Sequence, residues 1–566
     1  MKSILRLNAE NCQNCFKCIR ECPLKAIEFK ENHTKIIEEE CILCGKCMEI
    51  CPQNAKYVRQ NVDEVKALLA EGKPVCLSLA PSYTGWYGNA TFAQLSAALK
   101  KLGFARVEET AIGAAEVTKE YEELLASGKM KNVIATSCSS MVMLIERHFP
   151  ALIGSLAPVS SPMMAHARLM REAYGDIRVV FVGPCLSKMQ ESEDPLAGGL
   201  VDQVLTFEDI DLWLKEAGIR LEEEDPDATG VAQPLSRIYP KQEGIIKTML
   251  NNFHGYTPVS VDGHSRCLDF FRQMQEGEVD HLFVEANICI GGCIGGPIME
   301  KHRKNVIHSL VSLKSEPQPM DQNPSASASL TLLHPRVFAN RQVETKKPTE
   351  EQIREILASI GKTTKEQELN CGSCGYPTCR DKAAAVFNGK ADVTMCLPFL
   401  REQAENMSAT IISNSPNGII AFDTDLCVTE INPKGQELFG VDLSILGEMI
   451  PALYGETAFD EAREENRLVV KKVEGATPEI IVEFTVMYLA SNRMYIAFAK
   501  DISEQEHSRE ELSSLRMSTV DVAQNVIEKQ MRVAQEIASL LGETTAETKM
   551  ALTRLKKSIT EISSKD

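Results

Sequence analysis

The sequence predicts a multidomain chain that combines α/β and α+β parts. Its 566 residues are several times the usual length of one domain, so three to five domains are expected. Most of the 19 cysteines fall into regularly spaced groups within the first 400 residues. Between residues 57 and 312, strand-like apolar runs alternate with helical stretches, a pattern typical of a mainly parallel α/β core.

Charge and cysteine content narrow the class of protein. A formal net charge of −18 would repel nucleic acids and acidic membranes, so we expect neither as a partner. The start of the chain lacks a secretion-signal pattern, and no apolar run reaches the roughly 18 residues of a membrane span. A cytoplasmic protein is therefore expected, in which reduced thiols that bind metal are favoured over disulfides.

Residues 1–56 contain one cysteine unit twice. The units, Cys-x2-Cys-x2-Cys-x3-Cys-Pro, begin at Cys12 and at Cys41. A 4Fe-4S cluster needs four thiolates, and this repeat resembles bacterial two-cluster ferredoxins, with zinc or structural thiols as the alternative. The resemblance implies two 4Fe-4S clusters, one on Cys12, Cys15, Cys18 and Cys51, and the other on Cys22, Cys41, Cys44 and Cys47.

Residues 57–347 are the expected α/β domain. The runs NVIATSC, VVFVGPC and HLFVEANIC each end on a cysteine, and ligands gather at the carboxyl ends of parallel strands. Lys188, three residues after Cys185, adds a positive charge there. Residues 315–347, rich in Pro, Ser, Asn and Gln, are predicted to form a linker. The sequence thus predicts a buried metal site on four cysteines, Cys138, Cys185, Cys289 and Cys293.

The motifs TSCSSM, GPCLSKMQE and EANICIGGC resemble the three H-cluster signatures of FeFe-hydrogenases. The resemblance covers residues 1–312 and implies that these four cysteines bind a 4Fe-4S cluster. It further implies that Cys293 bridges to a di-iron unit carrying CO, cyanide and an azadithiolate. Lys188, Pro81 and Ser82 match the family's cyanide contacts.

The family's proton relay is interrupted in this sequence. Ser137 stands in place of the relay cysteine, and Ala157 in place of the relay serine. Matching the segment AEVT leaves Glu122 as one relay glutamate, with Leu125 replacing the other. Because each step of a proton path needs a donor within hydrogen-bond reach, turnover is expected to be low.

Three further substitutions surround the expected di-iron unit. Gly183 and Asn287 replace methionines, and Met163 replaces a glutamine. Such changes alter the potential of a cluster without removing a ligand. The pattern resembles the sensory branch of the family.

Residues 348–402 contain the third cysteine unit. It resembles the four-cysteine 4Fe-4S domain of anaerobic electron-transfer proteins, which implies one additional 4Fe-4S cluster, and zinc is the alternative. Cys76, Cys267 and Cys427 lack such neighbours and are expected to be buried thiols. The cysteines of the unit are Cys371, Cys374, Cys379 and Cys396.

Residues 403–503 resemble a PAS domain, through the segment NSPNGIIAFDTDLCVTEINPKGQELFG. No histidine lies between His334 and His507, and no flavin-binding cysteine motif surrounds Cys427, so neither haem nor flavin is expected there. In residues 504–566, apolar residues at 3,4 spacing predict two helices, broken at Gly542 and restarted by a capping box at Thr544. We expect a helical hairpin paired in a homodimer, with an ordinary amphipathic tail as the alternative.

Together these features predict a sensory FeFe-hydrogenase that reacts reversibly with H2 and protons at low turnover. Its redox state would pass through the 4Fe-4S clusters and the PAS domain to a partner protein in trans, a kinase or phosphatase. Two alternatives remain: a productive hydrogenase that exchanges electrons with a redox partner such as ferredoxin, and a hydrogenase-like iron-sulfur scaffold without the di-iron unit.

Overall fold

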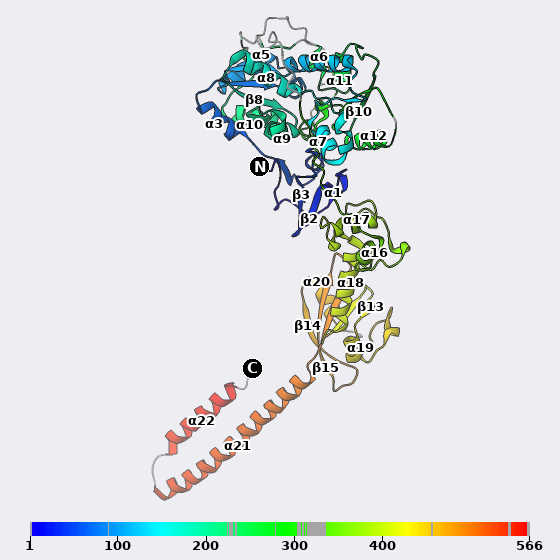
Figure 1. Ribbon diagram of the computed structural model, residues 1–566. Coiled ribbons are helices and arrows are strands. Elements are labelled where there is room, and N and C mark those ends of the chain that lie inside the picture. Colours follow the sequence, from blue (N-terminus) through cyan, green and yellow to red (C-terminus); the bar gives the residue numbers. More distant parts are fainter. Residues whose placement is uncertain are drawn as a thin grey trace. The chain divides into compact units, whose positions relative to one another are not determined.

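The computed structural model describes two compact units, Met1–Phe399 and Leu400–Asp566, which are considered separately (Figure 1). The described residues are 3–562 without 89, 224, 226–229, 233–234, 278, 303–306, 308–310, 312, 314–335, 454–456 and 542–544. No helix among them is long and apolar enough to cross a membrane. The expected domains 1–56, 57–347 and most of 348–402 thus fall within one unit, and their boundaries stay predictions.

The N-terminal part of the first unit is built from two small sheets and two short helices. Strand β1 (Leu5–Leu7) pairs antiparallel with β4 (Lys56–Val58), and β2 (Ile27–Lys30) with β3 (His33–Ile36). Helices α1 (Lys17–Glu21) and α2 (Lys46–Glu49) each begin inside a cysteine motif. Gly45, with φ +73°, leaves no room for a side chain, because a Cβ atom would lie 2.4 Å from Pro297. The second cysteine loop therefore approaches the α/β part closely.

The α/β part contains two parallel sheets. The first has the order β6-β5-β8-β9, and the second has the order β10-β11-β7. Every pairing in both sheets is parallel, which confirms the predicted parallel α/β core. The strands are β5 (Val75–Leu79), β6 (Arg106–Glu109), β7 (Val133–Ile134), β8 (Arg178–Gly183), β9 (Gln203–Thr206), β10 (Thr257–Asp262) and β11 (Leu282–Asn287).

Helices pack against these sheets and bury them. All five residues of β5 are buried, as expected for a central parallel strand. Helices α6 and α8 pack closely at Gly113, where a Cβ atom would lie 2.4 Å from the carbonyl oxygen of Pro162. The main helices are α5 (Phe92–Lys101), α6 (Ala111–Ser127), α7 (Ser139–His148), α8 (Pro162–Tyr174), α9 (Ser187–Glu193), α10 (Phe207–Glu216) and α12 (His264–Glu276).

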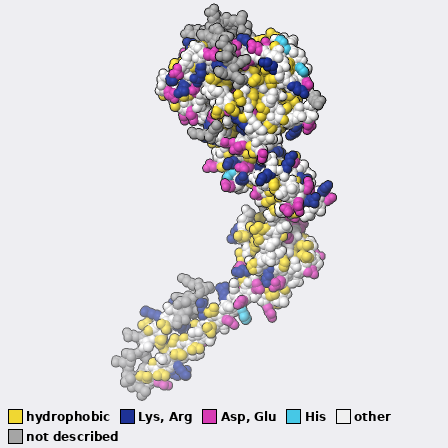
Figure 2. All heavy atoms as spheres, viewed as in Figure 1, with side chains coloured by type: hydrophobic (Ala, Val, Ile, Leu, Met, Phe, Trp, Pro, Cys, Tyr) yellow, Lys and Arg dark blue, Asp and Glu magenta, His cyan; other side chains and the backbone are white. Residues whose placement is uncertain are grey.

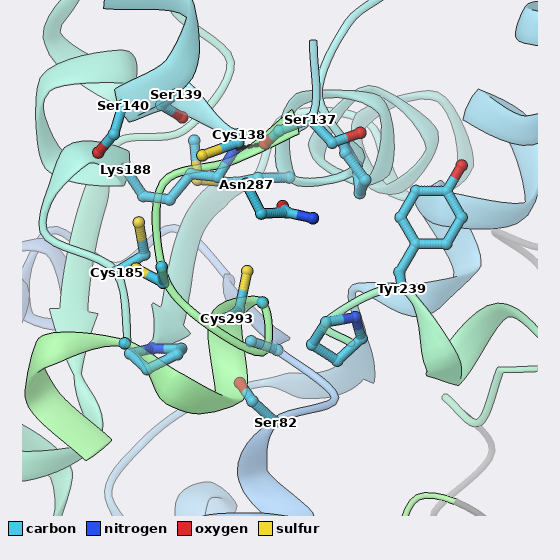
Figure 3. A pocket seen from close by; sticks show the side chains of 18 of the residues that line it. Ser82, Ser137, Cys138, Ser139, Ser140, Cys185, Lys188, Tyr239, Asn287 and Cys293 are labelled. Carbon is cyan, nitrogen blue, oxygen red and sulfur yellow. Dashed lines mark hydrogen bonds between the residues drawn. The ribbon is translucent and has the colours of Figure 1, made fainter. Parts of the chain in front are cut away.

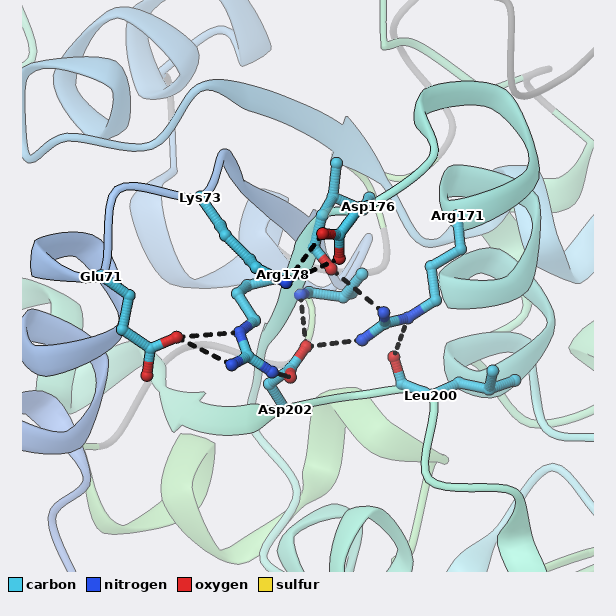
Figure 4. A network of polar contacts seen from close by, with 9 residues as sticks. Glu71, Lys73, Arg171, Asp176, Arg178, Leu200 and Asp202 are labelled. Atoms are coloured by element: carbon cyan, nitrogen blue, oxygen red, sulfur yellow. Dashed lines mark hydrogen bonds and ion pairs between the residues drawn. The ribbon is translucent and has the colours of Figure 1, made fainter.

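An ion-pair network anchors the first residues of β8 (Figure 4). Asp202 accepts hydrogen bonds from Arg178 at 2.9 Å, from Arg171 at 2.7 Å and from the Val179 amide at 2.7 Å. Arg178 also pairs with Glu71 at 2.7 Å. The network lies at the amino end of the strand, so the opposite end is left for Cys185.

The predicted linker is only partly described, because residues 315–335 lie outside the described residues. The segment that follows is irregular but fixed to the α/β part. Arg336 pairs with Glu191 at 2.8 Å, and Arg341 pairs with Asp194 at 2.7 Å. The Arg341 amide also donates to the Glu146 carbonyl at 2.9 Å. Residues 336–341 are therefore packed against the domain, because their two arginines reach carboxylates on it.

The third cysteine unit completes the first compact unit. Helices α16 (Glu350–Ala358) and α17 (Cys379–Phe387) pack against each other. The Phe29 amide of β2 donates to the Lys390 carbonyl at 2.8 Å, so this unit joins the N-terminal part directly. Ile19, Phe29, Tyr376 and Met395 share one buried apolar cluster there.

The second unit has a five-stranded antiparallel sheet of order β13-β12-β16-β15-β14. The strands are β12 (Gly418–Phe422), β13 (Val428–Ile431), β14 (Val469–Glu474), β15 (Ile481–Leu489) and β16 (Met494–Asp501). Asn432 caps α19 (Pro433–Phe439) by accepting from the Gly435 amide at 2.9 Å, and α20 (Ala458–Glu465) packs on the sheet. An antiparallel sheet with short helices fits the PAS domain that the sequence predicts in this part of the chain.

Two helices end the chain, α21 (Ser503–Leu541) and α22 (Thr545–Ile562), which contact each other as a hairpin (Figure 1). The predicted break at Gly542 and the cap at Thr544 lie outside the described residues. Hydrophobic side chains remain exposed along the hairpin (Figure 2). On α21, Val522, Val526 and Ile537 are each more than half exposed.

Candidate metal centres

The largest cysteine-lined cavity lies where the strands of both sheets end (Figure 3). Cys138 precedes α7, Cys185 follows β8, and Cys289 and Cys293 follow β11. All four line one cavity of about 1010 Å³, part of it open to solvent. The structure thus brings together four thiols that are separated by up to 155 residues in the sequence (138 to 293).

The surroundings of these thiols disfavour their ionisation. Burial raises the pKa of Cys293 to about 12, and it raises the pKa of Cys138 and Cys289 as well. The other cysteines of the group, which would be negatively charged, raise these pKa values further. Thiolates at this site therefore need a strong cationic partner, which bound iron would supply.

Lys188 is held at the cavity wall by a buried carboxylate. Its ammonium group donates to Glu191 at 2.6 Å and to the Ser137 carbonyl at 3.1 Å. Burial alone would raise the pKa of Glu191, but Lys188 and Arg336 lower it to about 2. Ser139 donates to the same carboxylate at 2.5 Å. Glu191 is therefore ionised and fixes the position of the lysine.

Four other predicted residues also line the cavity: Pro81, Ser82, Met163 and Asn287. The Ser82 hydroxyl is buried and has no hydrogen-bond partner among the described residues. A polar atom in this state fits a ligand that accepts or donates a hydrogen bond. The side-chain amide of Asn287 donates a hydrogen bond to the Glu285 carboxylate at 3.2 Å, and both residues belong to the third motif.

Gly183 is not among the lining residues, and the ring of Phe181 explains its position. A Cβ atom at Gly183 would lie 2.8 Å from that ring, and Phe181 itself lines the cavity. The aromatic ring therefore occupies the volume beside the glycine.

Only some of the predicted proton-relay positions lie at the main cavity. Ser137 lines the cavity, whereas Glu122 is half-buried and does not. The Tyr121 hydroxyl lies 3.4 Å from the Ser137 hydroxyl, so the structure places Tyr121 beside Ser137 instead of Glu122. Leu125 and Ala157 are both buried in one apolar cluster.

Of the other fifteen cysteines, twelve line three smaller cavities, four in each. The sets are Cys12, Cys15, Cys18 and Cys51; Cys22, Cys41, Cys44 and Cys47; and Cys371, Cys374, Cys379 and Cys396. Among the described residues, no three His, Cys, Asp or Glu side chains converge as they would around a single ion. Thiols that ring a cavity fit a polynuclear cluster better than one zinc ion.

Neighbouring cavities share walls or contacts. Cys44 lines both the main cavity and the cavity of Cys22, Cys41 and Cys47. At the third cysteine unit, the Lys25 ammonium donates to the Gly375 carbonyl at 3.0 Å. Burial lowers the pKa of Lys25, whereas Cys22 on one side and Cys374 on the other raise it. Lys25 therefore lies between two of the cysteine sets.

Several residues of the main cavity were not predicted from the sequence. Phe181 lies within a motif already singled out and could have been found from its position two residues before Gly183. Tyr239 and Ile245 also line the cavity but come from a segment without any motif. Arg336 reaches Glu191 from 145 residues along the chain (191 to 336), so no local pattern signals it.

Known protein families match four parts of this chain. The family described as "Iron only hydrogenase large subunit, C-terminal domain" matches residues 73–297. This part of the chain is a domain of the iron-only hydrogenase large-subunit family. Three further families match the rest: a 4Fe-4S dicluster domain at residues 4–52, a putative Fe-S cluster domain at 367–398 and a PAS domain at 406–473.

Curated relatives share parts of this hydrogenase architecture. Iron hydrogenase 1 of Clostridium pasteurianum is 24% identical over 42% of this chain and 52% of its own length. The periplasmic [Fe] hydrogenase large subunit of Nitratidesulfovibrio vulgaris is 32% identical over 38% of this chain and 58% of its own. The cytosolic Fe-S cluster assembly factor NAR1 of Encephalitozoon cuniculi is 26% identical over 37% and 63%. The chain thus spans between half and two thirds of these relatives.

Among solved structures, a variant of the FeFe-hydrogenase HydA1 from Chlamydomonas reinhardtii has a TM-score of 0.39 at 20% identity. The similarity covers 47% of this chain and 93% of that chain. The PAS domain of an HTR-like protein from Haloarcula marismortui covers 18% of this chain and 95% of its own, with a TM-score of 0.16 at 19% identity.

Proposed function

We propose that this protein is a sensory FeFe-hydrogenase that reacts reversibly with H2 at an H-cluster and signals the result through its other domains. The observation that carries the proposal is the main cavity, in which four thiols, the Lys188 ammonium and the unpartnered Ser82 hydroxyl face one space. When bound there, an H-cluster supplies the iron at which H2 is formed or split.

The roles of the cavity residues follow from their chemistry. Cys138, Cys185, Cys289 and Cys293 would hold the 4Fe-4S part, and Cys293 would also help to hold the di-iron unit. Lys188, fixed by Glu191, would donate a hydrogen bond to one cyanide, and Ser82 with Pro81 would contact the other. Phe181, Met163 and Asn287 would shape the space around the di-iron unit and tune its potential.

Low H2 turnover is the expected property that favours a sensory role over that of a productive hydrogenase. Ser137, with a hydroxyl pKa far above that of a thiol, is a poor acid at the relay position. Leu125 and Ala157 are buried among apolar residues and offer no donor. A slow hydrogenase supplies little useful flux, but its redox state still reports on H2.

Electron transfer would connect the cavity to the signalling part. Cys44 forms a common wall between the main cavity and the second cysteine set, and Lys25 lies between that set and the third unit. Two cysteine sets would hold 4Fe-4S clusters able to carry electrons away from the main cavity: Cys22, Cys41, Cys44 and Cys47, and Cys371, Cys374, Cys379 and Cys396. The PAS domain and a dimeric helical hairpin would pass the state to a partner kinase or phosphatase.

The similarity to the assembly factor NAR1 favours a second candidate, an iron-sulfur scaffold without a di-iron unit. Infrared spectroscopy of the chain matured with the di-iron unit separates the two. The sensory proposal predicts bands of CO and cyanide, and their absence would leave the scaffold. Turnover as high as that of a productive hydrogenase would contradict the sensory role.

A further inference from the structure

A line of polar side chains leads from the main cavity through the core to the surface, away from all the cysteine motifs. The Thr110 and Ser78 hydroxyls lie 2.7 Å apart, and the Ser78 hydroxyl lies 2.8 Å from His166 Nδ1. His166 Nε2 lies 3.1 Å from Glu108, whose other carboxylate oxygen accepts from the Tyr174 hydroxyl. Thr110 lines the cavity, so the line begins there.

The secondary structure explains why these five residues meet. Ser78 on β5 and Glu108 on β6 are register partners, so their side chains lie on the same face of the sheet. Helix α8 packs on β5, and His166 lies one turn after Met163, which lines the cavity. The His166 side chain is completely buried and contacts hydrogen-bonding groups through both ring nitrogens.

The outer end of the line reaches the surface at Tyr174. This residue is half-buried, and its ring lies 4.5 Å from the guanidinium of the exposed Arg106. Cys76 of β5 is a further ionisable group close to Glu108, and burial raises the pKa of its thiol to about 12. That thiol stays protonated at neutral pH, so it leaves the charge of Glu108 unchanged.

Two other series of hydroxyl groups that start at the cavity lead only to the backbone. The contact from Ser137 to Tyr121 continues to Thr136, which donates to the Val159 carbonyl at 2.7 Å. The Tyr239 hydroxyl contacts Thr118 and then Thr248, which donates to the Ile245 carbonyl at 2.6 Å. Neither series includes an imidazole or a carboxylate, the groups that exchange protons readily near neutral pH.

We propose that Tyr174, Glu108, His166, Ser78 and Thr110 conduct protons between the surface and the main cavity. The inference rests on the proposed function, because H2 chemistry in the cavity needs a supply of protons. These five residues would replace the family's proton path, which is interrupted at Ser137, Leu125 and Ala157. These five residues are thus positioned to deliver protons, and none of them is a proposed metal ligand.

For each proton that enters at the surface, one proton leaves into the main cavity. A proton reaches Glu108 through the Tyr174 hydroxyl, and the protonated carboxyl passes it to His166 Nε2. The Nδ1–H of His166 then protonates the Ser78 hydroxyl, which releases its own proton to Thr110. Thr110 releases a proton into the cavity. The starting state returns when the hydroxyl groups and the Glu108 carboxyl group rotate and the His166 ring turns over, which brings its remaining N–H back to Ser78. No electrons move in these steps.

The test uses the matured full-length protein with Glu108→Gln and His166→Gln, which keep similar volume and hydrogen bonding but exchange protons poorly. H2 turnover should fall about tenfold or more in each, since positioned acids and bases contribute at least that much. The infrared bands of CO and cyanide should stay at the wild-type positions. After a rapid pH change, these bands should respond at least about tenfold more slowly in the variants.

Thr248→Val is the matched control, because it removes a buried hydroxyl from the series that ends on the backbone. Its turnover and its response to the pH change should match wild type. If a core variant does not fold, Tyr174→Phe at the half-buried end serves in its place, with the same expected loss. Variants that respond as fast as wild type would overturn the proton path, whereas wild type without CO and cyanide bands would overturn the proposed function itself.

Discussion

At the scale of single residues, the hydrogenase domain fixes Lys188 from behind through Glu191. The carboxylate is fully enclosed and interacts with Lys188, Arg336 and Ser139. Removing one partner from a buried ion-pair network of this kind strongly destabilises the fold, because it leaves a buried charge without a counter-charge. The geometry therefore serves to keep an ammonium group at one point of the cavity wall.

Replacing Glu191 by Gln should destabilise the first compact unit by about 3–5 kcal/mol, since Lys188 and Arg336 would lose their counter-charge. The folded-state pKa of about 2 lies below the roughly 4.3 of an unfolded glutamate. The stabilisation is therefore complete above about pH 5 and is lost only as the pH falls toward 2.

Thermal unfolding should accordingly show a constant gap between wild type and Glu191→Gln from pH 6 to pH 8. A gap that widens or narrows within that range would show that Glu191 titrates there and that the assigned ion group is wrong.

Ser137→Cys should raise H2 turnover by about tenfold or more, because a thiol near pKa 8.5 exchanges protons much more readily than a hydroxyl. The measurement is the rate of H2 evolution by equal amounts of matured protein. Ser140→Cys, at another lining position, is the control and should leave the rate unchanged. Equal rates for wild type and Ser137→Cys would mean that this position does not limit turnover.

At the scale of elements, the short cysteine motifs predicted the site better than the helices did. Each motif follows a strand, and parallel strands bring their carboxyl ends together, so the four thiols of the main cavity could be grouped from sequence. Helix α6 shows the limit of this approach. A change of one residue turns a helical side chain by about 100°, which is why Tyr121, and not Glu122, lies beside Ser137.

Contacts between distant elements left no signal in the sequence. Residues 336–341 read as a linker from composition, yet Arg336 and Arg341 bind carboxylates of the α/β part. The line from Thr110 to Tyr174 draws on β5, β6, α6 and α8, so only the packed structure brings it together. Buried polar groups of this kind are visible only once their partners are known.

At the contact between α1 and the third cysteine unit, Lys25→Met should lower the midpoint potentials of the two clusters proposed on either side. A positive charge stabilises a cluster in its reduced, more negative form, so its removal makes reduction harder. Lys25→Arg keeps the charge and is the control. Titration followed by electron paramagnetic resonance measures the potentials, and unchanged values in Lys25→Met would remove Lys25 from the electron path.

At the scale of the whole molecule, the chain joins an iron-only hydrogenase domain to a PAS domain and a helical hairpin. The hairpin leaves apolar residues exposed at helical spacing, such as Val522, Val526 and Val533. Exposed apolar faces of this kind are typical of surfaces that bind a second copy or another protein. The hydrogenase domain, by contrast, buries its apolar residues in a core that it shares with the N-terminal part, for example with Ile4, Leu5 and Met48.

Removal of residues 504–566 should therefore leave H2 turnover unchanged while it abolishes dimerisation and binding of the signalling partner. Light scattering measures the oligomeric state, and a gas-phase assay measures turnover on the same sample. Loss of turnover in the shortened chain would show that the hairpin supports the hydrogenase domain and is not a separate output segment.

Electrons from H2 in the main cavity are proposed to reach the third cysteine unit. The most direct test is electron paramagnetic resonance of the matured, oxidised protein before and after exposure to H2, with Cys374→Ala for comparison. We expect H2 to produce the signal of a reduced cluster that is present in wild type and missing in Cys374→Ala. Turnover of H2 without any such signal would contradict it.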